Sequence, residues 1–124
     1  DMQAAIVDID EMIANVMFDN VYQVKFFKAF KSLFDGAVKT LKSYLRYQGI
    51  FQTEVLEIIK EAFYVEFIED GQTWVDMLFD TNDWAANNYK GLDIKARLCI
   101  KERYLPVLNK LNCFFQKKLE MRNE

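Results

Sequence analysis

The run from Asp80 to Tyr89 holds the densest group of side chains that could take part in binding chemistry. It packs six hydrogen-bonding side chains, a tryptophan and a tyrosine into ten residues. Such groups can hold a phosphate, a sugar or a base by hydrogen bonds, and aromatic rings offer faces on which a base can stack. We therefore expect a substrate-binding groove lined by Asp80, Thr81, Asn82, Trp84, Asn87 and Tyr89. Because Asn and Asp also cap helices and close turns, a purely structural use of this run is the alternative.

Groups that could carry out catalysis are scarce, because the chain has no histidine. Neither a Ser-His-Asp triad nor a Cys-His pair can form, and no imidazole can ligate zinc. The acidic pairs Asp8/Glu11 and Glu57/Glu61 have helical spacing, but a di-metal carboxylate bundle also needs Glu-x-x-His motifs. We therefore expect these acids to lie on solvated helix faces. We also expect no metal and no cofactor.

The composition indicates one helical domain over residues 1–124. The chain is 52% hydrophobic and 15% aromatic, which is far too apolar for a disordered segment. Acidic residues (19) outnumber basic ones (16), which argues against a strongly basic nucleic-acid binder. The low content of glycine (4) and proline (1) also argues against an all-β domain with many tight turns. A chain of this length can bury roughly two-thirds of its unfolded surface in a single core.

The two cysteines and the hydropathy pattern bear on the compartment. Cys99 and Cys113 lie 14 residues apart in one predicted helix, about 21 Å along its axis, too far for a disulfide. Two free thiols are typical of a reducing compartment. No run approaches ~18 apolar residues, and no basic segment precedes an apolar one at the start. We therefore expect no membrane span and no signal peptide, and a cytoplasmic location.

Hydrophobic periodicity predicts an all-α, up-and-down bundle of four principal helices with an additional short one. The expected helices cover residues 5–18, 21–47, 54–69, about 74–78 and 92–119. We expect Gly49 to end the second helix and Thr53 to cap the third. The short fourth helix is expected to stop at the polar residues 80–83, and Pro106 is expected to bend the last helix. The groove would then open between the short helix and the last one.

The two long helices have clear apolar faces. In the second, the apolar face carries Phe26, Phe30, Leu33, Phe34, Ala37, Leu41, Tyr44 and Leu45, opposite a row of mostly lysine side chains. In the last, we expect the inward residues to be Ile94, Leu98, Leu105, Leu108, Leu111 and Phe115. The phenylalanines exceed what narrow helical stripes can hide, so we expect some to cover a homodimer interface: Phe26, Phe27, Phe30, Phe34, Phe51, Phe114 and Phe115.

Several segments together resemble one protein family, the nucleotidyltransferase substrate-binding proteins. The resemblance lies, in the family's order and spacing, in residues 38–45, 49–50, 54–63, 70–78 with Asp80 and Asn82 beyond them, and 104–106. It covers about residues 20–118 and implies a left-handed up-and-down four-helix bundle, commonly a homodimer, within the HEPN superfamily. It also implies a partner, a minimal nucleotidyltransferase subunit, and a nucleotide or RNA as ligand.

The sequence departs from the superfamily where ribonuclease chemistry would lie. Active HEPN ribonucleases carry an Arg, four to six intervening residues and a His, often with a Tyr two residues later. Here the Arg position is Thr81, and the His position is Ala86, or Asn87 with one inserted residue. A threonine cannot stabilise a phosphorane as a cation does, and an amide cannot exchange a proton near pH 7. Ribonuclease activity by that route is therefore not expected, and we expect no catalytic residue and a protein that is not an enzyme.

Three functional hypotheses follow. The first is a non-catalytic substrate-binding subunit that acts with a separate minimal nucleotidyltransferase. The second is a degenerate HEPN ribonuclease, the toxin-like member of a toxin–antitoxin pair, in which Tyr89 is the adenylylation acceptor. The third is a plain helical interaction protein. A neighbouring gene for a small nucleotidyltransferase would separate the first two from the third, and RNA cleavage would separate the second from the first.

Overall fold

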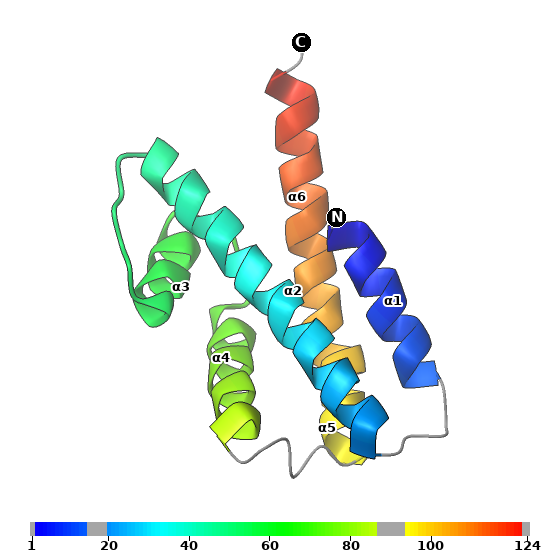
Figure 1. The fold of residues 1–124 in the computed structure, drawn as a ribbon. Helices are drawn as coiled ribbons and strands as arrows, with labels where there is room; N and C mark the ends of the chain where they lie inside the picture. Colours follow the sequence, from blue (N-terminus) through cyan, green and yellow to red (C-terminus); the bar gives the residue numbers. More distant parts are fainter. Residues whose placement is uncertain (1, 15–19, 87–93, 123–124) are drawn as a thin grey trace.

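The computed structural model describes residues 2–14, 20–86 and 94–122. All regular structure in these ranges is helical, which confirms the all-α class (Figure 1). The elements in chain order are α1 (Met2–Ala14), α2 (Asn20–Tyr47), α3 (Val55–Tyr64), α4 (Gly71–Ala86), α5 (Ile94–Cys99), the π-helical turn η1 (Ile100–Tyr104) and α6 (Leu105–Arg122).

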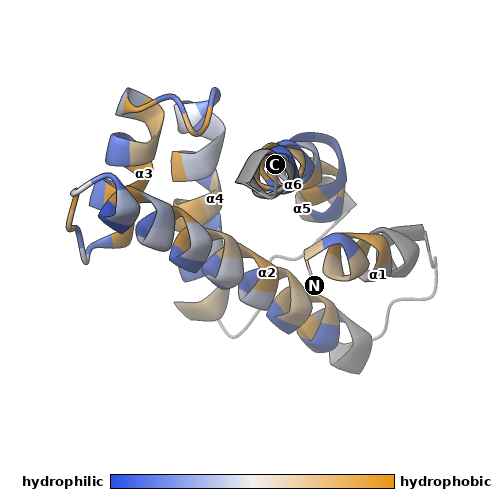
Figure 2. Ribbon diagram, turned by 90° about the horizontal axis from the view of Figure 1, so that it is seen from above, coloured by the Kyte–Doolittle hydropathy of each residue, from blue (hydrophilic) through white to orange (hydrophobic). Residues whose placement is uncertain are grey.

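The helices form an up-and-down arrangement in which α1, α2, α4 and the α5–η1–α6 rod alternate in direction (Figure 1). Seen from above, α2 runs along one side, and the other helices are arranged along it (Figure 2). Helix α1 packs on α2 and α6, α3 packs on α2 and α4, and η1 packs on α4. The additional short helix of the bundle is therefore α3, and α4 is a principal helix, which corrects the expectation that the fourth helix is the short one.

The apolar face predicted for α2 forms the centre of the core. Phe26, Phe30 and Phe34 are completely or almost completely buried, and every other residue of that face is buried except Tyr44, which is half-buried. Helix α2 ends where expected: Gly49 has φ +83°, and its N–H donates to the Arg46 carbonyl at 3.0 Å. A positive φ costs glycine little, so this residue can turn the chain out of the helix.

Helix α3 is shorter than the sequence suggested. Its N-cap is Glu54, which makes no side-chain capping bond, so the expectation that Thr53 caps this helix is wrong. The helix ends at Tyr64, because Glu66 adopts φ +65° and the Phe67 N–H returns to the Ala62 carbonyl at 2.9 Å. This left-handed turn directs the chain back toward α4, and residues 65–70 form a connection instead of continuing the helix.

Helix α4 continues through the expected polar break. Asp70 caps its start, accepting from the Thr73 N–H at 3.1 Å, and the helix runs to Ala86. Thr81 and Trp84 lie on the buried face, and the Thr81 hydroxyl donates to the Leu78 carbonyl at 2.9 Å. The prediction of a stop at residues 80–83 was wrong because burial of this face and local hydrogen bonds outweigh the low helix propensity of Asp, Thr and Asn.

The last rod contains a π turn next to Pro106, the residue at which the sequence predicted a bend. Immediately before it, η1 widens the helix by one residue, and the Leu105 N–H donates to the Ile100 carbonyl. Proline has no N–H and its ring crowds the preceding turn, so a π turn at this point accommodates it. Cys99 and Cys113, in α5 and α6, are both free thiols, as expected. Leu98, expected to face inward, is 44% exposed.

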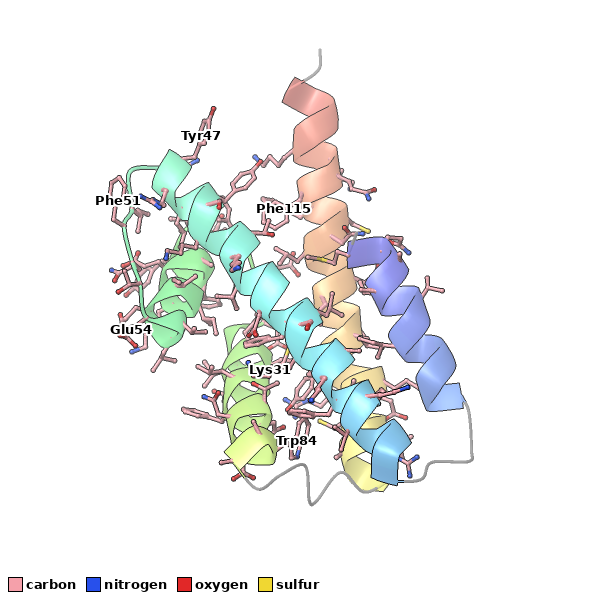
Figure 3. The ribbon with its side chains drawn as sticks, viewed as in Figure 1. Lys31, Tyr47, Phe51, Glu54, Trp84 and Phe115 are labelled. Atoms are coloured by element: carbon pink, nitrogen blue, oxygen red, sulfur yellow. The ribbon has the colours of Figure 1, made fainter. Side chains whose placement is uncertain are left out.

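Most of the phenylalanines assigned to a dimer interface are inside the single chain. Five of the seven are buried, Phe114 is half-buried, and only Phe51 is largely exposed. Phe27 meets Trp84 of α4 edge-on at 5.3 Å, and Phe30 stacks on Tyr104 of η1 at 6.0 Å. The expectation that these phenylalanines cover a dimer interface was therefore wrong for the five buried rings, because other helices of the same chain already cover them. Tyr47 and Phe51 project from the carboxyl end of α2 (Figure 3).

Candidate functional site

The structure places four of the six predicted groove residues on the last turns of α4. Asp80 is half-buried, and its carboxylate accepts a hydrogen bond from the Tyr104 hydroxyl. Thr81 is 1% exposed and Trp84 8%, whereas Asn82 is exposed. Trp84 points into the space between α4 and α2 (Figure 3), where it packs on Phe27. The two remaining groove residues, Asn87 and Tyr89, lie outside the described residues.

These four residues do not share one surface. Thr81 and Trp84 face the core, Asp80 faces η1, and Asn82 faces outward. The described geometry gives Trp84 a packing role, and it leaves the exposed amide of Asn82 as the group best placed to meet a ligand in this part of α4.

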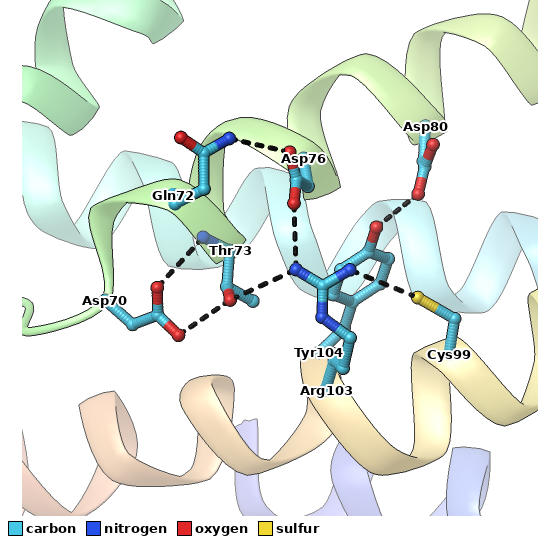
Figure 4. Close-up of polar contacts among 8 residues, drawn as sticks. All are labelled: Asp70, Gln72, Thr73, Asp76, Asp80, Cys99, Arg103 and Tyr104. Atoms are coloured by element: carbon cyan, nitrogen blue, oxygen red, sulfur yellow. Dashed lines mark hydrogen bonds and ion pairs between the residues drawn. The ribbon is translucent and has the colours of Figure 1, made fainter.

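A polar network joins the start of α4 to η1 (Figure 4). The Asp70 carboxylate accepts two hydrogen bonds from Thr73, one from its N–H at 3.1 Å and one from its hydroxyl at 2.7 Å. The Arg103 guanidinium then donates to the Thr73 hydroxyl oxygen at 3.4 Å and to the Asp76 carboxylate at 2.8 Å. Gln72 completes the set by donating to Asp76 at 2.9 Å. The network therefore fixes the first two turns of α4 against the π turn.

The charges in this network favour the ionised forms. The hydroxyl and N–H of Thr73 lower the pKa of Asp70, and the hydrogen bonds from Arg103 and Gln72 lower the pKa of Asp76. The same bond from Arg103 to Asp76 raises the pKa of Arg103 further. These groups stay charged near neutral pH and are engaged with one another, so their chemistry is that of an ion-paired helix junction.

Tyr104 is the buried member of the junction. Burial, together with the hydrogen bond to Asp80, raises the pKa of Tyr104 well above its ordinary value of 10.0. The phenol therefore stays protonated and donates to Asp80 across the α4–η1 contact. The π turn places Arg103 and Tyr104, two consecutive residues, so that both reach α4, with Arg103 also donating to the Cys99 sulfur at 3.9 Å (Figure 4).

A cleft of about 650 Å³ opens next to this junction, and we call it the α6 cleft. It lies between the connection that precedes α4, the first turn of α4 and the middle of α6. Its lining residues are Glu66, Phe67, Ile68, Glu69, Asp70, Trp74, Val107, Asn109, Lys110, Leu111, Cys113, Phe114 and Lys117. A cleft of this volume is within the range that holds small molecules and cofactors.

The α6 cleft has an aromatic floor and walls of opposite charge. Phe67 and Phe114 are half-buried, with ring centroids 5.7 Å apart, and Tyr44 packs edge-on against Phe67 at 5.2 Å. Three acidic residues of the connection line one side of the cleft, and two lysines of α6 line the other. Lys110 meets Glu69 across the opening at 3.8 Å, with both side chains largely exposed. The arrangement can bind a molecule through ring contacts and charge, and the free thiol of Cys113 also lines it.

Sequence reasoning missed this cleft, although one signal was present. Lys110, Phe114 and Lys117 follow the i, i+4, i+7 spacing of one helix face, which sets two cations beside a ring. The opposing acids belong to a segment predicted as helix, and their meeting with α6 depends on the left-handed turn at Glu66. That turn could not be predicted from a glutamate.

Two features are absent from the described part of the chain. Among those residues there is no group of three or more His, Cys, Asp or Glu side chains arranged to hold a metal ion. Within the same ranges, no helix is both long and apolar enough to cross a membrane.

Comparison with known proteins connects this fold to a family. A crystal structure of a protein from Thermus thermophilus superposes with a TM-score of 0.64, covering 96% of this chain and 98% of that one. At 18% identity, that likeness shows the shared fold. No curated protein matches in sequence. Residues 1–117 match the family described as "Nucleotidyltransferase substrate binding protein like". Since this match spans nearly the whole chain, the protein belongs to the nucleotidyltransferase substrate binding protein like family.

Proposed function

We propose that this protein is the non-catalytic, substrate-binding subunit of a two-component nucleotidyltransferase, acting with a separate minimal nucleotidyltransferase. The observation that carries the proposal is the family match over residues 1–117. The α6 cleft supports it, because it offers a binding volume whose lining can hold a ligand through ring contacts and charge. In this division of labour, the partner holds the nucleotide and metal, and this chain presents the acceptor.

The exposed end of α4 is the second part of the proposal. Asn82 is exposed there. Asn87 and Tyr89, which lie outside the described residues, follow in the sequence, and we propose that their amide and phenol also contact a partner or substrate. We expect Asn87→Ala and Tyr89→Phe each to lower the affinity of the complex for its substrate by roughly 2- to 13-fold, the effect of one lost hydrogen bond of about 0.5–1.5 kcal/mol. If both variants leave partner binding, tyrosine modification and transfer unchanged, this end is only structural.

A homodimer is also part of the proposal, on narrower grounds than the sequence suggested. The side chains now available for an interface are the exposed ones at the α2 end and on the outer faces of α3 and α4: Tyr47, Phe51, Phe63, Tyr64 and Phe79. Sedimentation at micromolar concentration tests it. We expect a species of twice the 14.7 kDa chain mass, and a single species at the chain mass would contradict the dimer.

Complex formation tests the proposed function itself. We propose that the protein is cytoplasmic and that a small nucleotidyltransferase is encoded beside its gene. The two proteins are co-expressed in a bacterial cytoplasm, and only one of them carries an affinity tag. We expect the untagged partner to co-purify in stoichiometric amount, and the isolated chain to leave RNA intact. Failure to associate would contradict the proposal. Metal-independent RNA cleavage that is lost with Asn87 or Tyr89 substitutions would favour a ribonuclease instead.

A further inference from the structure

We propose that the α6 cleft binds a zwitterionic small molecule built on a flat ring, with its cationic group toward the 66–70 connection and its anionic group toward α6. This inference rests on the proposed function, since the molecule would be the acceptor substrate presented to the nucleotidyltransferase. The cleft volume of about 650 Å³ accommodates such a molecule together with water.

The charge distribution along the cleft leads to the zwitterion. Glu66 and Glu69 come from one wall, and Lys110 and Lys117 come from the other. Asp70, also on the acidic wall, is already bound to Thr73 through both carboxylate oxygens. A polyanion such as single-stranded RNA would meet the acidic wall, and a polycation would meet the lysines. A ligand with one charge of each sign is attracted by both walls.

Some of these charges are available to a ligand. The Lys110–Glu69 pair spans 3.8 Å between two largely exposed side chains, so it is a weak pair that a ligand can replace. Among the residues whose side chains the structure describes, neither Glu66 nor Lys117 makes an ion pair or a hydrogen bond through its side chain. In that part of the chain, one carboxylate and one ammonium group thus face the opening without a protein partner.

The rings on the floor indicate the flat body. Phe67 and Phe114 approach to 5.7 Å between centroids, and both keep part of their surface exposed. Lys110 and Lys117 lie four residues before and three residues after Phe114 on α6, so they flank this ring about one turn away on either side. A ligand ring that stacks on Phe114 can therefore carry two charged substituents at opposite ends. The anionic substituent would contact a lysine, and the cationic one would contact the acidic connection.

A series of simple probes tests this chemistry on the whole chain. The probes are 4-(aminomethyl)benzoate, which carries both charges on a ring, and benzylamine and 4-methylbenzoate, which carry one each. The fourth, trans-4-(aminomethyl)cyclohexanecarboxylate, keeps both charges and replaces the aromatic ring. In NMR titrations we expect the first to bind at least fivefold more tightly than the other three, with amide shifts centred on Phe67, Cys113 and Phe114. Equal affinities, no binding, or shifts centred elsewhere would overturn the inference.

Charge-neutralising variants assign the two ends of the probe. Lys117→Gln should lower the affinity for 4-(aminomethyl)benzoate at least threefold and leave the affinity for benzylamine unchanged. Glu66→Gln should lower the affinity for 4-(aminomethyl)benzoate and leave the affinity for 4-methylbenzoate unchanged. Lys39→Gln, an exposed lysine on α2 outside the cleft, is the matched control and should change nothing. Loss of affinity in the control equal to that in Lys117→Gln would show a general charge effect and overturn the assignment.

Cysteine alkylation gives an independent readout. Cys113 lines the cleft, whereas Cys99 lies beside Arg103 at the helix junction. We expect saturating 4-(aminomethyl)benzoate to slow iodoacetamide modification of Cys113 at least threefold and to leave Cys99 unaffected. Equal rates with and without the probe would overturn the inference. If the probe fails while the nucleotidyltransferase still co-purifies, the cleft assignment falls and the proposed function stands. If co-purification fails while the probe binds, the proposed function falls and the cleft assignment stands.

Discussion

The Tyr104 hydroxyl, buried in the π turn, donates a hydrogen bond to the Asp80 carboxylate on α4. These two residues lie 24 positions apart in the sequence, and their contact joins the bundle's fourth helix to its last rod. Asp80 was predicted to line a groove, and the structure gives it this packing partner as well. Asp80 lies about one helical turn after Asp76 on α4, and Asp76 pairs with Arg103, the residue before Tyr104. The two bonds together therefore fix the position of α4 against the last rod.

Removing the hydroxyl of Tyr104 tests that contact. Tyr104→Phe keeps the ring that stacks on Phe30 and leaves the Asp80 carboxylate without its donor. We expect the free energy of unfolding to fall by about 1–3 kcal/mol, as for a hydrogen bond to a charged group. Urea denaturation measures it, with Tyr64→Phe, at an 83% exposed tyrosine, as the control. Equal stability of the two variants would show that the bond adds nothing.

The Asp76–Arg103 pair predicts a pH dependence of stability. Hydrogen bonds from Arg103 and Gln72 lower the folded-state pKa of Asp76 below the ordinary 3.8. A carboxylate of this kind stabilises the fold above its unfolded pKa, and that stabilisation is lost as the pH falls through the lower folded pKa. The stability advantage of wild type over Asp76→Asn should therefore be constant from pH 7 to about 5 and shrink below about pH 4. An advantage that is the same at pH 3 and pH 7 would contradict this.

The left-handed residue Glu66 predicts a stabilising substitution. A non-glycine residue at φ +65° has a strain of about 1–2 kcal/mol, and glycine removes it at a smaller entropic cost. Glu66→Gly should raise the free energy of unfolding by about 0.5–1 kcal/mol. Gly49→Ala, at φ +83° with open space around the added carbon, should lower it by a similar amount. Thermal unfolding of both proteins measures the pair, and shifts of the same sign would contradict the explanation.

The packing of Trp84 separates its structural role from a stacking role. Its ring is 8% exposed and meets Phe27 edge-on at 5.3 Å. Trp84→Ala should therefore lower the free energy of unfolding by about 3–5 kcal/mol through the cavity it leaves. Phe79→Ala on the same helix, at a 58% exposed ring, should cost far less. Calorimetry measures both losses of stability. Equal losses for Trp84→Ala and Phe79→Ala would contradict the packing role of Trp84 and favour a stacking role.

The periodicity of the sequence was sufficient for α2 and for the helical class. Phe26, Phe30 and Phe34 recur on one face, and Gly49 marks the end, so local rules and tertiary packing agree there. They disagree in α4, where Asp80 and Thr81 have turn-forming side chains. The burial of Thr81 and the bond from Tyr104 to Asp80 arise only when the last rod packs on α4. Local propensity alone could not predict that the helix continues to Ala86.

The candidate site was less predictable for the same physical reason. Groove residues were inferred from hydrogen-bonding capacity along the chain, which says nothing about the direction of each side chain on a helix. The α6 cleft depends on the turn at Glu66, which brings Glu69 within 3.8 Å of Lys110, 41 residues later. Contacts of this range are set by the fold as a whole, so spacing within one helix could suggest only the α6 half of the cleft.

The most direct test of the proposed substrate-binding role measures transfer of a labelled nucleotidyl group by the proposed partner nucleotidyltransferase to the small molecules of a cell extract. The assay is run with the partner alone and with increasing amounts of this protein, and the labelled product is quantified. We expect product formation to rise with this protein and to saturate at the stoichiometry of the purified complex. It should be reduced in the Lys117→Gln complex and unchanged in the Lys39→Gln complex. Equal product formation with and without this protein, in a complex shown to be assembled, would contradict the account.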